Sequence, residues 1–520
     1  MKKQVIMHTT VAILVIALLT GITFGGYLLS VHFGLTGLKI RTDMTYQTVE
    51  GFGASSAWTY QNLGLIEDED VKEDAIERLY GDKGLALNIF RYNIGGGGKE
   101  LDVYKDKQRG AESFFVKDNF KGDYSVFADA NNYDFTRDKG VRELFEKALS
   151  KGNITEVVFF ANSPHYLMTK NGLTHASAKK ENNLKEECYE AFSDYLLVIT
   201  NWLCENIVYK YDREIKVYIS PVNEPQWDWG GADASQEGCH YDPEELAKFY
   251  DVFSKKLTAY NEAHATSFEM DLFESGNYKL TESGTKFQTY MKEMSNYDYF
   301  NELDTISVHS YGADNNLRAR NMAHSFLKRS YSDKKFSVSE YCVLKDGVDP
   351  SIDMGLYSAK VVMEDLNTLN AVRWNWWLSV STYDYEDGLV YWNPSDNSLQ
   401  VTNRYYAMGQ FSRYIEPGSV IVGTEYGDSI GWNGVESLAF IKPDGRLALI
   451  VINNSPRAHK IRLYGGYGTV TEIVTDAERN WAQSEYEFNN YIEVSAKSIT
   501  TFIFDGEAPY EDPKGGYFGK

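Results

Sequence analysis

Short apolar segments alternate with longer segments of helical periodicity along residues 49–378. The short segments are rich in β-branched and aromatic residues, a composition that predicts strands. Eight such strands are expected, at Val49–Gly53, Ala86–Tyr92, Glu156–Ala161, the stretch that begins at Val217, Ser267–Leu272, Thr305–Val308, Phe336–Ser339 and Ala371–Leu378. Strands that alternate with helices favour a parallel sheet, and eight such units are typical of a (β/α)8 TIM barrel. An open doubly wound sheet is the alternative.

The segments between these strands predict helices. Pro243–Ala263 shows the clearest signal, because Asp242 fits the N-cap position and a proline follows at the first helical position. The other expected helices are Glu67–Leu79, Arg137–Ser150, Leu184–Val208, Glu282–Met294, Leu317–Ser330 and Ile352–Leu369.

The pattern changes after about Arg413, where short strand-like segments alternate with turn signals such as Pro443–Gly445. This texture predicts an all-β sandwich side domain. We therefore expect an α/β protein with these parts: an N-terminal signal segment at 1–37, a strand at 38–48 contributed to the β side domain, the catalytic barrel at 49–413, the sandwich at 414–507 and a flexible tail at 508–520.

The N-terminus combines a basic start with an apolar stretch. Lys2 and Lys3 precede residues Val5–Leu29, a pattern typical of an export signal. Because no A-x-A-like cleavage site follows and the stretch is long enough to cross a bilayer, we expect a retained signal-anchor. A cleaved signal peptide is the alternative. In both cases the body of the protein is expected outside the cytoplasmic membrane, at the cell surface or secreted.

Composition narrows the class of partner. With 52 Lys and Arg against 74 Asp and Glu, the net charge is −22, which disfavours nucleic acid but carries no penalty for a neutral polysaccharide. Aromatic residues make up 14% of the chain; their flat faces suit sugar rings, although they also fill cores. The four cysteines form no CxxC pair, which argues against a disulfide framework or a structural zinc site.

Two glutamates at predicted strand ends are the candidate catalytic residues. Glu224 follows the fourth strand in V-N-E-P, and Glu340 follows the seventh in S-V-S-E-Y. A barrel gathers the carboxyl ends of its strands on one face, so the two side chains are expected to meet there. Cleavage of a glycoside with retention needs such a pair, about 5–5.5 Å apart. A solvated surface charge is the alternative for either glutamate alone.

Further polar side chains follow other strands. Asn223 is placed to bond a sugar hydroxyl and to orient Glu224, and Arg91 to hold a nucleophilic carboxylate ionised, with a structural salt bridge as its alternative. A Tyr311 hydroxyl near the nucleophile would help to keep it ionised, with core packing as the alternative. The remaining candidates for substrate contact at strand ends are Asn162 and His309.

Tryptophans are the candidate sugar platform. We expect Trp58, Trp227, Trp229 and Trp376 to face the substrate, and Trp374 or Trp377 to pack inside the barrel wall.

Other chemistries lack a supporting pattern. Gly95–Gly98 resembles a phosphate loop, but no G-K-[ST] ending follows it. His165, His240 and His309 lack metal-ligand spacing, and no G-x-S-x-G elbow supports a serine hydrolase. No metal and no cofactor are therefore expected.

Seven pieces of the chain resemble glycoside hydrolase family 30, and they occur in the order of that family. They are G-F-G-A-S-S-A-W (51–58), F-R-Y-N-I-G-G-G (90–97), A-N-S-P (161–164), P-V-N-E-P (221–225), S-V-H-S-Y (307–311), S-V-S-E-Y (337–341) and W-N-W-W (374–377). The resemblance covers most of residues 40–507 and implies a retaining (β/α)8 enzyme with a β-sandwich side domain.

The resemblance also implies roles. By this resemblance Glu224 corresponds to the acid/base and Glu340 to the nucleophile. The residues that the resemblance places around the first sugar subsite are Arg91, Asn223, His309, Tyr311 and Trp376. The chain departs from the family pattern at Ala54, where glycine is frequent, and at His165, where a second proline is frequent. The second departure leaves the shape of the loop after the third strand open.

The substrate is inferred from the loop after Glu224. N-E-P-Q-W-D-W followed by S-Q-E-G-C (235–239) resembles the branch that contains endo-β-1,6-galactanases, in which Gln236 and Glu237 would line a subsite. We therefore expect an endo-acting hydrolase of β-1,6-galactan side chains, with a polysaccharide or oligosaccharide as partner. The alternatives are a xylanase or glucuronoxylanase, a β-glucosidase or β-1,6-glucanase of the same family, and a non-catalytic cell-surface carbohydrate-binding protein.

Overall fold

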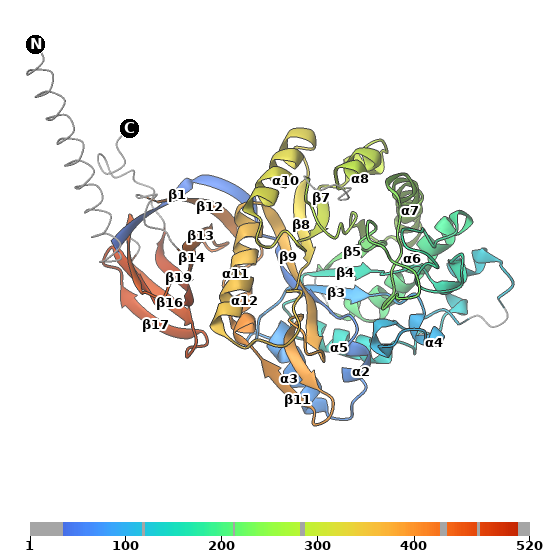
Figure 1. Cartoon of the computed structure of the whole chain (residues 1–520), viewed down its shortest axis with the longest axis horizontal. Coiled ribbons are helices and arrows are strands. Elements are labelled where there is room, and N and C mark those ends of the chain that lie inside the picture. Colours follow the sequence, from blue (N-terminus) through green and yellow to red (C-terminus); the bar gives the residue numbers. More distant parts are fainter. Residues whose placement is uncertain are drawn as a thin grey trace, which may run out of the picture.

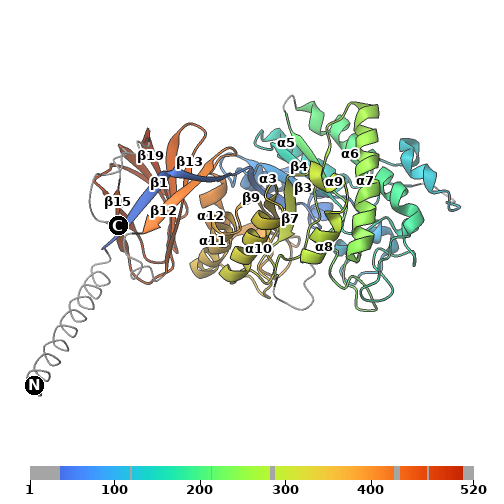
Figure 2. The same cartoon turned by 90° about the horizontal axis from the view of Figure 1, so that it is seen from above.

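The structure is a computed structural model that describes residues 35–116, 120–211, 214–280, 287–426, 434–464 and 468–507. The apolar N-terminal stretch, expected to be a signal-anchor, and the expected tail at 508–520 lie outside the described residues. Within the described ranges, no helix is both long enough and apolar enough to cross a membrane. Figures 1 and 2 show two bodies side by side, a barrel with surrounding helices and a smaller β domain, with strand β1 running along the smaller one.

Eight parallel strands form a (β/α)8 barrel, as the sequence pattern predicts. They are β2 (Gly51–Ser55), β3 (Ile89–Asn93), β4 (Glu156–Phe160), β5 (Lys216–Ser220), β6 (Glu269–Met270), β7 (Thr305–His309), β8 (Lys335–Glu340) and β9 (Ala371–Ser381). Each strand pairs in parallel with the next from β2 to β6 and from β7 to β9, and β9 pairs with β2. A parallel bridge between Ser275 and Val308 joins the remaining gap between β6 and β7.

Strand β6 is shorter than the expected strand Ser267–Leu272, because the backbone leaves regular pairing after Met270. The N–H of Asp271 still donates to the carbonyl of Ile219 at 2.9 Å, and the carbonyl of Leu272 accepts from the N–H of Ser307 at 2.5 Å. In the irregular segment that follows, Glu274 takes a left-handed φ of +52°, and its side chain lies in the polar network of the barrel interior.

Helices connect the strands and cover the barrel. Helix α7 (Pro243–His264) begins with a capping box between Asp242 and Glu245, with Pro243 in its first turn, as the sequence signals predict. The other helices of eight or more residues are α3 (Glu69–Tyr80), α5 (Lys139–Ser150), α6 (Tyr189–Asn206), α8 (Phe287–Met294), α10 (Leu317–Ser330), α11 (Ile352–Asn367) and α12 (Asn403–Ser412). The shorter ones are α2 (Tyr60–Leu63), α4 (Gly98–Leu101) and α9 (Tyr299–Glu302).

The second body is a β-sandwich built from short alternating strands. Its strands are β1 (Leu35–Thr48), β12 (Val420–Tyr426), β13 (Val435–Ile441), β14 (Arg446–Asn453), β15 (His459–Tyr464), β16 (Thr469–Thr475), β17 (Ala482–Glu487), β18 (Tyr491–Val494) and β19 (Ser498–Glu507). Strand β1 pairs antiparallel with β12 and parallel with β15, so the N-terminal strand is part of this sheet. Residues such as Leu449 and Phe502 fill the sandwich core.

A hairpin that periodicity does not predict follows the eighth barrel strand. Strands β10 (Gly388–Asn393) and β11 (Ser398–Val401) pair antiparallel, and β10 continues the barrel sheet beyond β9. The hairpin places the loop at 382–388 at the carboxyl end of β9. This loop contributes to the site described next.

Candidate active site

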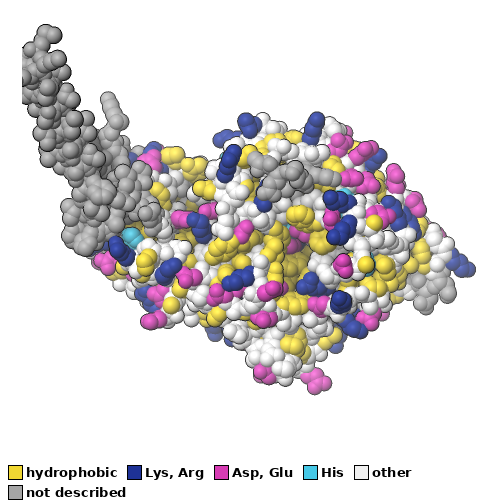
Figure 3. All heavy atoms as spheres, in the orientation of Figure 1, with side chains coloured by type: hydrophobic (Ala, Val, Ile, Leu, Met, Phe, Trp, Pro, Cys, Tyr) yellow, Lys and Arg dark blue, Asp and Glu magenta, His cyan; other side chains and the backbone are white. Residues whose placement is uncertain are grey.

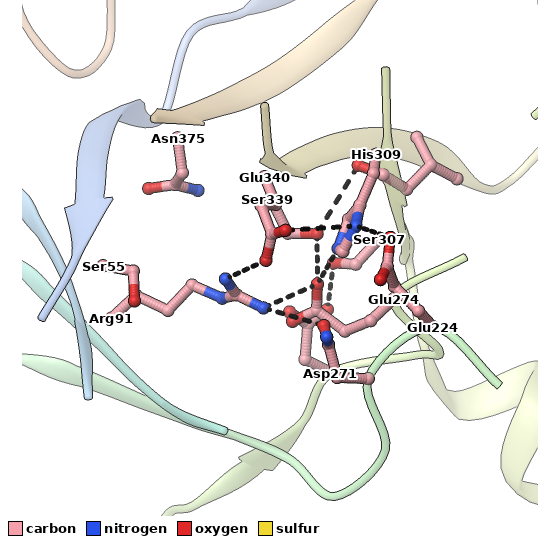
Figure 4. A network of polar contacts seen from close by, with 12 residues as sticks. Ser55, Arg91, Glu224, Asp271, Glu274, Ser307, His309, Ser339, Glu340 and Asn375 are labelled. Atoms are coloured by element: carbon pink, nitrogen blue, oxygen red, sulfur yellow. Dashed lines mark hydrogen bonds and ion pairs between the residues drawn. The ribbon is translucent and has the colours of Figure 1, made fainter. Parts of the chain in front are cut away.

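The carboxyl ends of the barrel strands bring Glu224 and Glu340 together. Glu224 follows β5 and Glu340 is the last residue of β8; they are 6% and 4% exposed. A carboxylate oxygen of each and a ring nitrogen of His309 lie within 4.8 Å of one another. Figure 4 shows these side chains converging from different strands.

The backbone and side chain of Glu224 are fixed by three contacts. Its N–H donates to the carbonyl of Glu274 at 2.9 Å, and its own carbonyl accepts from Trp229 Nε1 at 2.8 Å. Its Oε1 lies 3.0 Å from His309 Nδ1. These contacts hold the residue at a φ of +47°, a conformation that costs on the order of 1–3 kcal/mol for a residue other than glycine. Such strain, over-determined by its surroundings, is typical of functional sites.

Glu340 is held by two donors. Arg91 Nη1 donates to Oε2 at 2.7 Å, and the hydroxyl of Tyr311 donates to Oε1 at 3.0 Å. Burial raises the pKa of Glu340, while the charges of His309 and Arg91 oppose that rise. The carboxylate is therefore kept in one orientation by hydrogen bonds that favour its ionised form.

Arg91 lies fully buried on β3, beneath the two glutamates. Its guanidinium stacks on the Phe160 ring, 3.8 Å from the ring centroid. Besides Glu340 it reaches Asn223 Oδ1 at 3.2 Å and Glu274 Oε2 at 3.2 Å. The planar fork thus connects residues from three other strands.

His309 lies between the carboxylates. Its Nδ1 contacts Glu224 at 3.0 Å and lies 3.7 Å from Glu340 Oε1, and its Nε2 contacts Glu274 Oε2 at 3.0 Å. Burial lowers the pKa of His309, but the three carboxylates outweigh it and raise the pKa to about 10. Because both ring nitrogens face acceptors, the doubly protonated imidazolium satisfies every contact.

Glu274 and Asp271 form a lower layer of acids. Burial opposes ionisation of Glu274, but the charge of Arg91 and the contact with His309 outweigh it and lower the pKa of Glu274 to about 2. Burial and the charge of Glu274 raise the pKa of Asp271 to about 6, although Ser307 donates to it at 2.5 Å. Arg91 and His309 thus stabilise the ionised form of Glu274 more than that of Asp271.

A chain of amides orients Asn223. Its Nδ2 donates to Asn162 Oδ1 at 3.1 Å, and Asn162 Nδ2 donates to Asn93 Oδ1 at 3.2 Å. Since its Oδ1 also accepts from Arg91, the amide of Asn223 has a fixed direction beside Glu224 and Glu340.

The two glutamates lie at the bottom of a cleft of about 490 Å³. Its lining is Trp58, Arg109, Asn223, Glu224, Trp227, Trp229, Gln236, Tyr311, Glu340, Cys342, Leu344, Trp377, Tyr383, Asp384, Tyr385 and Asp387. Aromatic faces with a few polar groups are typical of sites that bind a small molecule or a sugar. Figure 3 shows hydrophobic side chains gathered around a hollowed part of the barrel body.

Comparison with models of known protein families shows which family the chain belongs to. Residues 36–391 match the model of O-Glycosyl hydrolase family 30, and residues 418–502 match the model of the glycosyl hydrolase family 30 beta sandwich domain. The chain belongs to glycoside hydrolase family 30. It is therefore an O-glycosyl hydrolase, and its barrel and sandwich are the two parts that the family models describe.

The chain is similar to several known proteins, among them the following three. An endo-β-1,6-galactanase from Hypocrea rufa is 24% identical over 416 residues, which are 75% of this chain and 76% of that protein. An exo-β-1,6-galactobiohydrolase from Bifidobacterium longum subsp. longum is 22% identical over 387 residues, 59% of this chain and 24% of that protein. The crystal structure of a conserved exported protein from Bacteroides fragilis has a TM-score of 0.77 at 22% identity and covers 90% of this chain and 100% of that one, which shows the shared fold.

In this family 30 enzyme, the site residues expected from the sequence fall into three groups according to where they lie relative to the cleft. Those that line the cleft are Trp58, Asn223, Glu224, Trp227, Trp229, Gln236, Tyr311 and Glu340. Those directly beneath it are Arg91, Asn162 and His309, each no more than 3% exposed. Trp376 and Glu237 do not line the cleft. Substrate contact by each of these side chains stays a prediction.

Trp376 was expected to face the substrate and Trp377 to pack inside the barrel wall, but the structure places them the other way round. Trp376 is 1% exposed and its Nε1 donates to the carbonyl of Asp387 at 2.6 Å, whereas Trp377 lines the cleft. The register between β2 and β9 shifts at this point: Ala54 pairs with Trp376, and Ser55 pairs with Leu378. Trp374 and Trp376 share the outer face of β9, where Trp374 Nε1 donates to Asp365 of α11 at 3.0 Å, whereas Trp377 lies on the opposite face. Alternation separates Trp376 from Trp377, but it does not say which face of the strand is the inner one.

Glu237 anchors a loop instead of lining a subsite. It is 1% exposed, and its carboxylate accepts from the N–H groups of Gly98 at 2.7 Å, Ala111 at 3.2 Å and Gly96 at 3.3 Å. Burial raises the pKa of Glu237 to about 8, against the effect of the three amides. The residue joins the loop after β5 to the loop after β3.

Sequence reasoning missed several residues of the site. Glu274 carried a detectable signal, because it follows the fifth predicted strand, but no role was assigned to it. Arg109 lies in an irregular loop without periodicity, and its guanidinium stands over the rings of Trp58 and Tyr383, 5.1 and 5.4 Å from their centroids. Cys342, Tyr383, Tyr385 and Asp387 also reach the cleft through loop geometry that no local pattern encodes.

Proposed function

We propose that this family 30 enzyme cleaves β-linked polysaccharide with retention, with Glu340 as nucleophile and Glu224 as acid/base. The observation that carries the proposal is the short separation of the two carboxylates, whose oxygens lie within 4.8 Å. Retaining glycosidases separate their carboxyl groups by about 5–5.5 Å, whereas inverting enzymes need about 6.5–9.5 Å to admit a water molecule between carboxylate and sugar.

The first step forms a glycosyl-enzyme ester. A Glu340 oxygen attacks the anomeric carbon, the bond to the leaving oxygen breaks, and protonated Glu224 transfers its proton to that oxygen. Arg91 and Tyr311 hold Glu340 in its attacking orientation, and their hydrogen bonds keep it ionised before attack.

The second step hydrolyses the ester. Glu224, now a carboxylate, removes a proton from a water molecule whose oxygen attacks the anomeric carbon, and Glu340 leaves as a carboxylate. The sugar departs with the new hydroxyl on the same face, and Glu224 is protonated again. Asn223, fixed beside the pair, supplies an amide for a sugar hydroxyl in both steps.

The proposed substrate is β-1,6-galactan, attacked within the chain. The printed names of both similar hydrolases refer to β-1,6-linked galactose, and one of these proteins is matched over three quarters of its length. The cleft offers tryptophans on both sides for extended sugar contact, with Trp58 and Trp377 5.3 Å apart edge to face, and Trp227 38% exposed. Likeness to an exported protein and the basic, apolar N-terminus support action outside the cytoplasmic membrane.

The test is a substrate panel with the purified full chain. β-1,6-Galactan, glucuronoxylan, β-1,6-glucan and aryl β-glycosides are incubated with wild type and with Glu340→Gln, and products are sized by chromatography. We expect short β-1,6-galacto-oligosaccharides of mixed length from wild type and none from the variant. Release from xylan or glucan alone would overturn the proposed substrate; wild-type turnover by Glu340→Gln would overturn the mechanism.

The acid/base role has a separate test. Glu224→Ala should lose most activity on polysaccharide but retain more on an aryl glycoside with a good leaving group, because that group needs little protonation. Added azide should then restore turnover and yield a β-glycosyl azide, since a small anion replaces the activated water. Absence of rescue on an activated aryl glycoside would count against Glu224.

A further inference from the structure

Glu274 is a buried carboxylate that the mechanism above does not use. It is fully buried in the segment that follows β6, below Glu224 and Glu340. Three donors converge on its Oε2: His309 Nε2 at 3.0 Å, Arg91 Nη2 at 3.2 Å and the hydroxyl of Ser339. Burial of an ionised carboxylate costs free energy unless a cation or hydrogen-bond donors compensate its charge, and Arg91 and His309 are the cations beside Glu274.

The backbone of Glu274 is tied to the acid/base as well. Its carbonyl accepts the N–H of Glu224 at 2.9 Å, and the two residues have left-handed φ values of +52° and +47°. Strain of this kind persists only where the surroundings impose it. The pair therefore sets both the direction of the Glu224 side chain and the position of the carboxylate behind His309.

We propose that Glu274 is a positioning residue that holds His309 as an imidazolium shared by the two catalytic carboxylates. The inference rests on the proposed roles of Glu224 and Glu340. An imidazolium carries two N–H donors, and Glu224 and Glu274 accept from opposite sides of the ring. With Glu274 neutral, only Glu340 and Glu224 would oppose the effect of burial, which disfavours the charged form of the ring, so His309 would hold its proton less tightly.

His309 is surrounded by charged and titratable groups from several strands. The charged and acidic groups around it in Figure 4 are Arg91 from β3, Glu340 from β8, and Glu224, Asp271 and Glu274 from the segments after β5 and β6. The ring of Tyr311 lies 5.7 Å from the His309 ring, and its hydroxyl contacts Cys342 at 3.7 Å. Burial raises the pKa of both Tyr311 and Cys342 well above their usual values, so neither contributes charge near neutral pH. Among these described residues the acids outnumber the cation Arg91, which favours a charged His309.

The consequence is a shift of the working pH range. The imidazolium lies 3.0 Å from Glu224 and 3.7 Å from Glu340, and a cation at such distances favours the charged form of an acidic neighbour. In kcat/KM, the acidic limb of the pH profile reports the nucleophile and the basic limb reports the acid/base. Loss of the cation should move both limbs to higher pH.

The experiment compares pH profiles of kcat/KM on an aryl glycoside that wild type hydrolyses. Glu274→Gln keeps the shape of the side chain but removes its charge, and should move both limbs upward by about one pH unit, the low end of the effect of a neighbouring charge. If this variant does not fold, His309→Asn carries the test, because it removes the same cation and should produce the same shift. An unmoved profile in the folded variant overturns the proposal.

A matched variant separates a local charge effect from destabilisation. Glu156→Gln replaces another buried carboxyl group of the barrel, paired with Arg373 at 3.2 Å at the start of β4, and should leave the profile in place even if the melting temperature falls. A similar shift in this variant would show a general effect of destabilisation and overturn the proposal.

The outcomes also distinguish this inference from the proposed function. If wild type hydrolyses no glycoside, or if Glu340→Gln retains wild-type activity, the catalytic assignment fails and the inference fails with it. If wild type is active, Glu340→Gln is inactive and the Glu274→Gln profile is unmoved, only the role of Glu274 fails.

Discussion

Arg91 Nη1 donates to Glu340 Oε2 at 2.7 Å, although the two residues are 249 positions apart in the chain. Both are buried, and the same guanidinium also contacts Asn223 and Glu274. The planar guanidinium thus sets the spacing between three side chains: Glu340, which we propose as the nucleophile, Asn223 and Glu274. The barrel makes this possible by bringing β3 and β8 to opposite sides of a narrow interior.

Arg91→Lys should therefore be much less active although the charge is kept. An ammonium group is a point charge and cannot reproduce a planar fork that contacts three residues. We expect kcat to fall roughly 100-fold, as misplacement of a catalytic group by about 1 Å does, with a smaller change in KM. Steady-state kinetics on an aryl glycoside measure both; kcat within a factor of two of wild type would contradict this role.

Trp377 and Trp376 should respond differently to truncation. Trp377→Ala removes a face of the cleft and should raise KM by about fivefold, because stacking of a ring on one aromatic side chain contributes on the order of 1 kcal/mol. Trp376→Ala creates a buried cavity and should reduce the free energy of unfolding by about 3–5 kcal/mol. Steady-state kinetics and denaturant unfolding of both variants distinguish the two roles. A raised KM in Trp376→Ala together with an unchanged KM in Trp377→Ala would contradict this placement.

Glu237→Gln should loosen the wall of the cleft. The amide nitrogen of glutamine would face a backbone N–H, so at least one of the three donors loses its acceptor, at a cost of about 1–3 kcal/mol. Because Gln236 lines the cleft next to this anchor, KM on oligosaccharides should rise while kcat on a small aryl glycoside stays near wild type. Unchanged stability and unchanged KM together would show that the anchor has no role.

The stability that depends on His309 should fall in alkaline solution. The pKa of His309 is raised from its ordinary value near 6.5 to about 10, so the folded state binds its proton more tightly than the unfolded chain. The resulting stabilisation is fully present below about pH 6.5 and is lost as the pH rises through about 10. The difference in unfolding free energy between wild type and His309→Asn should therefore be larger at pH 6 than at pH 10. An equal difference at both pH values would contradict a buried imidazolium.

The sequence predicts the barrel and the catalytic pair for the same reason. Buried parallel strands are short apolar segments, and polar residues near their carboxyl ends lie on the face where a barrel builds its site; Glu224, Glu340 and Arg91 were predicted in this way. The sandwich was predicted from the spacing of its turns.

Features that depend on local irregularity were not predicted. Alternation does not say which face of β9 lines the cleft, so Trp376 was expected there in place of Trp377. Strand β6 ends at Met270, and the left-handed φ of Glu274 lies in the irregular segment that follows. Glu237 lies in a loop, where contacts come from tertiary packing and leave no periodic pattern. The cation Arg109 reached the cleft in the same way.

The most direct test of the central claim is the configuration of the first product. Time-resolved proton NMR of the anomeric signals, during hydrolysis of the β-glycoside that wild type cleaves fastest, shows which anomer appears before mutarotation. Carboxylates within 4.8 Å predict double displacement, so the β-anomer should appear first and the α-anomer only later. Initial appearance of the α-anomer would contradict a nucleophilic Glu340 and the account built on it.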